Sequence, residues 1–188
     1  MKKVCVLGAG SWGTALAAHL ANNDCQVTLW GRPEDDIDLI KLNQENQRFL
    51  PGVKLPDGVY PETDIQRAMN DIDLLIISVP SQALREVLLL VQDYIPAKTR
   101  IVNTAKGLEI ASGLRMSQVV KEVLGNQYMP RFAVLSGPSH AEEVSRQVPT
   151  AVTVAAYSKD TAYYVQDTFM ASNLRVYTNP DVAGVELG

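Results

Sequence analysis

The chain has only two cysteines, no long apolar run and little net charge, and each absence excludes a class of protein. Among its 188 residues, Cys5 and Cys25 stand apart from each other and from any cluster of histidines or carboxylates. We therefore expect neither a disulfide framework nor a metal site. Because two isolated thiols in a chain of this size are typical of a reducing compartment, we expect a cytoplasmic protein.

No stretch approaches the roughly 20 apolar residues that a membrane-spanning helix needs. The longest apolar runs are Leu74–Ile77 and Val87–Val91. The N-terminus imitates a signal peptide, since Lys2 and Lys3 precede an apolar stretch, but glycines interrupt that stretch and make this interpretation the weaker one. The net charge of -4 provides no basic field that would attract nucleic acid or an anionic membrane. We therefore expect no nucleic-acid partner and no membrane insertion.

The chain does contain a regular alternation of short apolar runs and stretches with helical periodicity. The runs predict strands at 4–7, 26–30, 73–79, 101–104, 132–135, 151–155 and 174–177. Apolar residues three or four apart predict helices between the strands, the first with Trp12, Leu16 and Leu20 on one face. Prolines and glycines between residues 51 and 61 predict a loop or short hairpin inserted between these units.

Strands that alternate with helices in this way indicate right-handed crossovers and a mostly parallel sheet. The continuous apolar run at Leu74–Ile77 is typical of a strand that is buried on both faces. No repeat, low-complexity segment or linker divides the sequence. The predicted fold class is therefore α/β, a Rossmann-like doubly wound, mostly parallel sheet with helices on both faces. One dinucleotide-binding domain is expected to fill residues 1–188.

The motif with the clearest chemical meaning is the segment at 8–13, which has the form G-x-G-x-x-G. The segment follows a predicted strand and opens a predicted helix, and this context gives the pattern its meaning. Gly8 permits a tight turn, Gly10 lets the backbone approach a pyrophosphate, and Gly13 allows the helix to pack closely on the strand. The amide groups at the start of the helix would then bind the phosphates. The alternative is a glycine-rich turn without a ligand.

The end of the second predicted strand favours one form of the cofactor. An NAD-specific site usually places Asp or Glu about 20 residues after the glycines, where it holds the ribose 2′-hydroxyl. Residues 29–32 contain no carboxylate, and Arg32 is available to pair with a 2′-phosphate. We therefore predict that NADPH is preferred over NADH. The alternative is that Arg32 is a solvated loop arginine.

Ligands of open α/β sheets bind beyond the carboxyl ends of the strands, where this chain has three predicted loops. The loops cover 78–81, 103–107 and 136–143. Lys106, which lies in the second loop beside a glycine, could hold a phosphate or polarise a carbonyl group. The alternative is a solvated surface lysine.

The third loop carries residues with both a structural and a functional interpretation. Ser139 and Glu142 have the spacing of a capping box, with Ser139 as the N-cap and Glu142 at the third helical position. This cap is compatible with an anion site at the same helix end. His140 is a weak candidate for a general base, because no carboxylate is identifiable to orient it. His19 lies in mid-helix and is expected to be structural.

Five segments taken together resemble one known family. They are GAGSWGTALA at 8–17, NQRFLPGVKLP at 46–56, VPSQALR at 79–85, NTAKGLE at 103–109 and SGPSHAEEV at 136–144. In this order they resemble the N-terminal domain of bacterial NAD(P)-dependent glycerol-3-phosphate dehydrogenase, and the resemblance covers essentially the whole chain. It implies an oxidoreductase that reduces dihydroxyacetone phosphate to sn-glycerol 3-phosphate with NAD(P)H, for phospholipid synthesis.

The resemblance also implies roles for individual residues. Those that would contact the cofactor, beside the glycines, are Ser11, Trp12, Arg32, Lys106 and Ala141. Those that would contact the substrate are Lys106, Gly137 and Ser139. Lys106 would thus lie between the two ligands and support the reaction by stabilising the developing alkoxide.

Members of the family continue into a helical C-terminal domain that binds the substrate and carries the main catalytic lysine. That lysine would come after Gly188, so we expect this chain to bind the cofactor and to turn over substrate poorly or not at all. Two alternatives stay open. They are a non-catalytic dinucleotide-binding module and a related β-hydroxyacid dehydrogenase with another substrate. The oligomeric state is also open, with a homodimer as one alternative.

Overall fold

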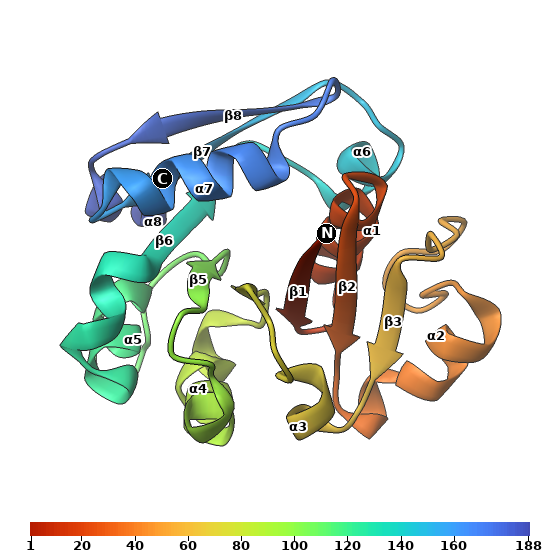
Figure 1. Cartoon of the computed structure of the whole chain (residues 1–188), viewed down its shortest axis with the longest axis horizontal. Coiled ribbons are helices and arrows are strands. Elements are labelled where there is room, and N and C mark those ends of the chain that lie inside the picture. Colours follow the sequence, from red (N-terminus) through yellow and green to blue (C-terminus); the bar gives the residue numbers. More distant parts are fainter.

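The computed structural model describes all residues from Met1 to Gly188 and is built around one sheet of eight strands (Figure 1). Across the sheet the strands lie in the order β3-β2-β1-β4-β5-β6-β7-β8. Their bounds are β1 Lys2–Leu7, β2 Cys25–Trp30, β3 Val59–Glu62, β4 Leu74–Ile77, β5 Arg100–Asn103, β6 Phe132–Ser136, β7 Thr150–Ala156 and β8 Leu174–Asn179.

The direction of the strands confirms the predicted fold class. The strands from β3 to β6 pair in parallel, and their order 3-2-1-4-5-6 is that of the Rossmann fold. β7 is antiparallel to β6, and β8 pairs in parallel with β7. The order reverses between β1 and β4, and in open α/β sheets ligands bind beyond the carboxyl ends of the strands at such a point.

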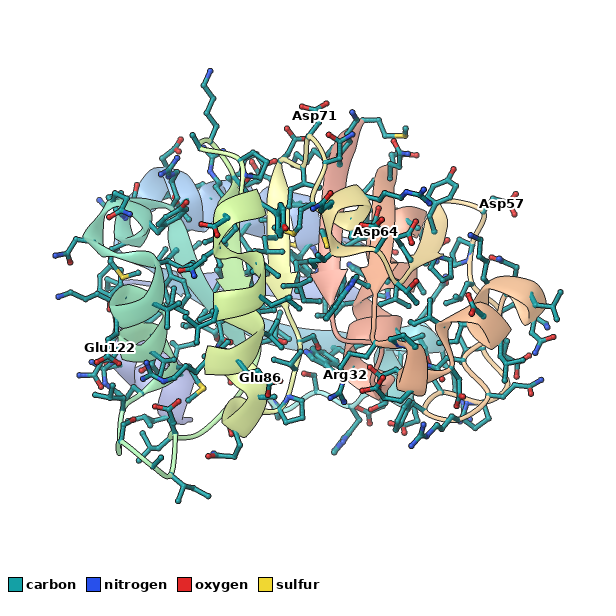
Figure 2. All side chains as sticks on the ribbon, turned by 90° about the horizontal axis from the view of Figure 1, so that it is seen from below. Arg32, Asp57, Asp64, Asp71, Glu86 and Glu122 are labelled. Carbon is teal, nitrogen blue, oxygen red and sulfur yellow. The ribbon has the colours of Figure 1, made fainter.

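Helices cover both faces of the sheet, as predicted. Their bounds are α1 Ser11–Asn22, α2 Ile37–Asn43, α3 Ile65–Ala68, α4 Leu84–Val91, α5 Met116–Leu124, α6 Ala141–Ser145, α7 Lys159–Phe169 and α8 Val182–Leu187. Helices α3, α4 and α5 line the lower side of the sheet in Figure 1, and Figure 2 shows α4 from that side, between α5 and α3. Helices α1, α2 and α7 pack against the other face. None of the helices is both long enough and apolar enough to cross a membrane.

The central strands contribute side chains to both hydrophobic layers. On β1, Val4 and Val6 pack with α1 and α7, whereas Cys5 and Leu7 point to the opposite layer with α4 and α5. Since successive side chains of a strand alternate between faces, a strand covered on both sides must be apolar throughout. Each fully buried Val or Leu of this kind stabilises the fold by about 1.5–3 kcal/mol. The continuous apolar runs of the sequence follow from this arrangement.

One prediction for the insert at 51–61 is wrong. Residues Val59–Glu62 form β3, which pairs in parallel with β2 at the edge of the sheet. The prolines pointed to a loop, but an edge strand accommodates Pro61, because one side of its backbone has no partner strand and needs no N–H donor. Only an isolated antiparallel bridge between Glu45 and Lys54 corresponds to the expected hairpin.

Candidate functional site

The glycine turn lies between the ends of the two central strands. Gly8 has a φ of +109°, and its N–H donates to the carbonyl oxygen of Trp30 at 2.8 Å. Ser78, just after β4, donates its N–H to Leu7 O at 2.8 Å, which fixes the two strand ends together. A Cβ at Gly13 would collide with the carbonyl oxygen of Gly8, so the absence of a side chain lets α1 start directly against the strand. The predicted role of Gly13 in helix–strand packing is confirmed.

The first turn of α1 is open to a ligand. Gly10 is the N-cap of this helix, no side chain caps the helix, and the first turn carries no acidic residue. Nothing lies within 4 Å of the position that a Cβ at Gly10 would take. The first N–H groups of a helix have no partner inside it, and the helix dipole adds partial positive charge there. This space therefore fits the pyrophosphate of a dinucleotide.

The segment at 46–56, one of the five that carry the family resemblance, packs against this turn and supports it. Asn46 is fully buried, and its Nδ2 donates to Ala9 O at 2.8 Å and to Thr14 Oγ1 at 2.9 Å. Its Oδ1 accepts the N–H of Phe49 at 3.1 Å. A buried amide that satisfies three groups holds residues 46–49 against the glycine turn. The sequence held no specific signal for this role, because Asn46 stands in a polar run between Glu45 and Gln47.

Beside the turn lies a cavity of about 700 Å³, which we call the adenosine-side cleft. Its lining includes Gly8, Gly10, Arg32, Arg48, Phe49 and Pro80. Its volume and its partly apolar lining are those of a small-molecule site. The cleft also contains Glu86 of α4, and Figure 2 shows Arg32 and Glu86 at the same end of the molecule. The predicted cofactor residues Gly8, Gly10 and Arg32 therefore share one cavity.

Arg32 in this cleft is held by the acidic turn that follows it. Its backbone N–H donates to Asp35 Oδ2 at 2.9 Å, and its Nε lies 3.5 Å from both Asp35 Oδ2 and Glu34 Oε1. The side chain is 59% exposed, and neither Nη atom makes a hydrogen bond within the chain. Because both Nη groups keep free donors at the cleft, Arg32 can receive an anionic ligand.

A second cavity, of about 440 Å³, lies where α1, β5 and β6 meet, and we call it the Lys106 cavity. It brings together predicted site residues from three distant segments: Ser11, Trp12, Lys106, Gly137, Ser139 and Ala141. The ammonium group of Lys106 donates to Gly137 O at 3.1 Å. Two of its three N–H bonds remain for a ligand. The cavity combines a cation with the start of α1, which suits a phosphorylated or carbonyl compound.

The predicted capping box at the third loop is wrong. Helix α6 begins at Ala141, with His140 as its N-cap and no side-chain capping bond. Ser139 lies before the helix, where its N–H donates to Gly137 O at 2.9 Å in a tight turn. The N-cap therefore moves by one residue, from Ser139 to His140, and both Ser139 and Glu142 line the Lys106 cavity instead of capping α6.

The two histidines differ as expected. The ring of His140 lines the Lys106 cavity without any hydrogen bond to orient it. His19 is buried on α1, and its Nε2 lies 2.8 Å from Phe169 O on α7. Burial lowers the pKa of the His19 imidazole, which keeps the ring neutral. The expectation that His19 is structural is confirmed.

The segments at 79–85 and 103–109 contact each other, and these contacts hold the Lys106 loop in place. Gln82 donates to Leu108 O at 2.8 Å and accepts the N–H of Ile110 at 3.0 Å. Arg85 forms a two-pronged pair with the buried carboxylate of Glu109, with both distances 2.9 Å. Segment 79–85 therefore anchors the loop that carries Lys106.

We expect the Arg85–Glu109 pair to stabilise the fold in a pH-dependent way. The hydrogen bonds from Arg85 and from Ser112 lower the pKa of the Glu109 carboxyl from 4.5 to about 2. A carboxylate whose pKa is lowered by folding stabilises the protein above its unfolded pKa, and this stability is lost as the pH falls toward the folded value. The urea midpoint of Glu109→Gln should therefore fall below that of the unaltered chain at pH 6, and the gap should narrow between pH 4.5 and pH 2. 

Glu122→Gln is the matched control, because Glu122 pairs with the same arginine but its side chain is 58% exposed. Exposed ion pairs contribute little, so this variant should stay close to the unaltered chain at every pH. If the difference in urea midpoint between Glu109→Gln and the unaltered chain did not change with pH, this would contradict the lowered pKa of Glu109.

Comparison with known proteins shows which family the sequence of this chain matches. The family model "NAD-dependent glycerol-3-phosphate dehydrogenase N-terminus" matches residues 3–162. Glycerol-3-phosphate dehydrogenase [NAD(P)+] of Syntrophomonas wolfei is 57% identical over 188 residues, which is all of this chain and 55% of the relative. The Moorella thermoacetica enzyme of that name is 48% identical over 187 residues, again 55% of its length.

Solved structures of glycerol-3-phosphate dehydrogenases also match the fold of this chain. The crystal structure of glycerol-3-phosphate dehydrogenase from Coxiella burnetii superposes with a TM-score of 0.91 at 36% identity, over 98% of this chain and 56% of that chain. The Plasmodium falciparum glycerol-3-phosphate dehydrogenase superposes with a TM-score of 0.88 at 27% identity, over 98% of this chain and 54% of that one. The chain thus spans about half the length of the relatives it matches.

Proposed function

The chain belongs to the NAD-dependent glycerol-3-phosphate dehydrogenase N-terminal family, and we propose that it is the cofactor domain of an enzyme that makes sn-glycerol 3-phosphate. The proposed reaction is the reduction of dihydroxyacetone phosphate by NADPH or NADH. The observation that carries this proposal is the position of Lys106 and Gly137 beside the open first turn of α1. This arrangement puts a cation next to the site that fits a dinucleotide.

The proposed cofactor site runs along both cavities. The glycine turn, with Gly8, Gly10 and Gly13, would hold the pyrophosphate through the amides of Ser11 and Trp12. The adenosine half would lie in the adenosine-side cleft, with Arg32 against the 2′-phosphate. The nicotinamide half would extend into the Lys106 cavity, where Ala141 is a further contact.

The proposed chemistry divides between the cofactor and the residues around the substrate. When bound, the cofactor supplies a hydride to the carbonyl carbon of the substrate. Lys106 would donate to the substrate oxygen or phosphate and so stabilise negative charge as it develops. Ser139 and Gly137 would orient the substrate in the same cavity. Gly137 has no room for a side chain, since a Cβ there would lie 2.9 Å from Ala151 O.

We assign the remaining catalytic and substrate-binding groups to the part of such proteins that this chain does not cover. The relatives are nearly twice as long as this chain. We propose that the helical substrate domain lies in that half, with the main acid–base lysine and, as the family resemblance implies, an arginine that binds the substrate phosphate. The enzyme would act in the cytoplasm and supply phospholipid synthesis. This chain alone would bind the cofactor with little or no turnover.

The test uses the protein in which this chain is joined to the proposed substrate domain, which we call the protein with both halves. NADPH absorbance is followed after dihydroxyacetone phosphate is added, and the expected result is oxidation that depends on the substrate. A sample that binds NADPH but shows no oxidation would contradict the proposal. That outcome would leave a dinucleotide-binding module without this activity, or a dehydrogenase for another substrate.

Arg32→Ala tests the proposed preference for NADPH. The variant should weaken NADPH binding by about 1–3 kcal/mol, the cost of losing a charge-assisted contact, and should spare NADH. The substitution keeps the backbone N–H that donates to Asp35, so the turn should stay folded. Isothermal titration of the chain with each cofactor measures the difference. Equal weakening of both cofactors would refute the 2′-phosphate role.

A further inference from the structure

A second arginine reaches the adenosine-side cleft from a different part of the chain. Arg48 lies in the segment that Asn46 holds against the glycine turn. Its Nη1 donates to Glu34 O at 2.9 Å and lies 3.4 Å from Asp36 Oδ2. Its guanidinium lies over the ring of Phe49, 4.8 Å from the centroid. Arg48 and Arg32 are therefore joined to the same acidic turn, at 34–36, and both line the cleft.

The charge balance at this turn shows why one arginine is a weak anion site. The Nε of Arg32 faces two carboxylates, those of Glu34 and Asp35. A phosphate monoester carries a charge of about −1.5 to −2 at pH 7, so this acidic surrounding would oppose it. Arg48 has a single carboxylate partner, Asp36, at 3.4 Å. Arg48 is therefore the cation whose charge is less compensated.

The hydrogen-bonding capacity of Arg48 leads to the same conclusion. Only its Nη1 makes hydrogen bonds within the chain, to Glu34 O and Asp36. Its Nε and Nη2 groups have no partner, and the side chain is 54% exposed at the cleft. A guanidinium presents its donors in a planar fork that matches phosphate oxygens. The contact with the Phe49 ring and the bond to Glu34 O restrict the side chain near this position.

We propose that Arg48 is the second arginine of the 2′-phosphate site and determines, with Arg32, the selectivity for NADPH over NADH. This inference rests on the proposed function, because it assumes that a dinucleotide occupies the cleft. The ligand class is a phosphate monoester on the adenosine ribose. Each arginine offers free N–H groups, and the pair offsets the acidic turn that Arg32 alone faces.

Two other roles for Arg48 give different results and can be separated. If Arg48 only braces the turn at 34–36 against the segment at 46–49, its loss should weaken both cofactors and lower the stability of the fold. If Arg48 only packs against the adenine, its loss should weaken both cofactors equally, because NADH and NADPH carry the same adenine. Selective weakening of NADPH belongs to the 2′-phosphate role alone.

The experiment measures binding of NADPH and NADH to the chain by isothermal titration, with Arg48→Met as the variant. Met keeps an unbranched apolar side chain over Phe49 and removes the charge. We expect NADPH binding to weaken about tenfold or more, as for the loss of a hydrogen bond between charged groups, and NADH binding to change less than about twofold. Adenosine 2′,5′-bisphosphate should lose affinity in parallel with NADPH, and AMP should not.

The chain offers a matched control for this substitution. Arg131 also lies over an aromatic ring, that of Tyr128 at 5.5 Å, and its Nη2 donates to Gln127 O at 3.3 Å, but it is outside the cleft. Arg131→Met should leave the affinities for both cofactors unchanged.

The urea midpoint of Arg48→Met shows whether the fold itself has changed. Equal loss for NADPH and NADH, or unchanged NADPH binding, would overturn the inference while leaving the proposed function intact. If the unaltered, folded chain binds neither cofactor, the proposed function fails and the inference fails with it.

Discussion

Gly13→Ala is expected to destabilise the chain by about 3 kcal/mol, the upper range for overpacking a site that cannot relax. The atom that the new Cβ would meet is the backbone oxygen of Gly8, in the turn whose strand ends are fixed by the Ser78–Leu7 hydrogen bond. Either α1 must move off the sheet or the turn must open. Urea unfolding of the purified variant measures the loss, and the variant should also fail to bind NADPH.

Gly10→Ala is the matched control, because the same methyl group is added three residues earlier. Here the Cβ would meet nothing within 4 Å, and Gly10 has an extended backbone with φ of −72° that alanine adopts readily. The stability should fall by about 1 kcal/mol or less, because Gly is a better N-cap than Ala, and so by clearly less than for Gly13→Ala. Binding of NADPH should still be lost, because the methyl group would occupy the space proposed for the pyrophosphate. A Gly10→Ala variant that binds NADPH normally would place the phosphates elsewhere.

Lys106→Ala in the protein with both halves is expected to lower kcat for dihydroxyacetone phosphate by about 10²–10³, the usual effect of removing one preorganised donor to a developing oxyanion. The reason is that Lys106 is the only Lys or Arg that lines the Lys106 cavity. Its loop is fixed by Gln82 and by the Arg85–Glu109 pair, so the ammonium group is held close to Gly137. The measurement is steady-state oxidation of NADPH.

Two further variants show whether the loss comes from the position of the charge. Lys106→Arg keeps a cation there and should retain more activity than Lys106→Ala. Lys98→Ala removes an exposed lysine that lines neither cavity and should leave the rate unchanged. Normal turnover by Lys106→Ala would contradict this role and favour the alternative, that Lys106 is a solvated surface lysine.

The parts of the fold that could be predicted are those set by local patterns. The glycine turn is one, since Gly8 has a positive φ and a Cβ at Gly13 would collide with the carbonyl oxygen of Gly8. The central strands are another, because burial on both faces requires runs such as Leu74–Ile77. Position at the end of a strand was sufficient to select Lys106 and the loop at 136–143, which the structure brings to one cavity.

The parts that could not be predicted depend on contacts between distant segments. The edge strand β3 is determined by pairing with β2, whereas local preference at Pro61 pointed to a loop. Ser139 has the spacing of a cap, but the turn between Ser139 and Gly137 delays the helix. The roles of Asn46 and Arg48 follow from contacts with Ala9 and Glu34, more than ten residues away, which leave no periodic pattern in the sequence.

A crystal structure of this chain with NADPH bound is the most direct test of the proposed cofactor site. We expect the pyrophosphate at the first turn of α1, the 2′-phosphate between Arg32 and Arg48, and the nicotinamide ring beside Lys106. Any other placement of the dinucleotide, or a nicotinamide ring that turns away from Lys106, would contradict the assignment of the two cavities to one cofactor and its substrate.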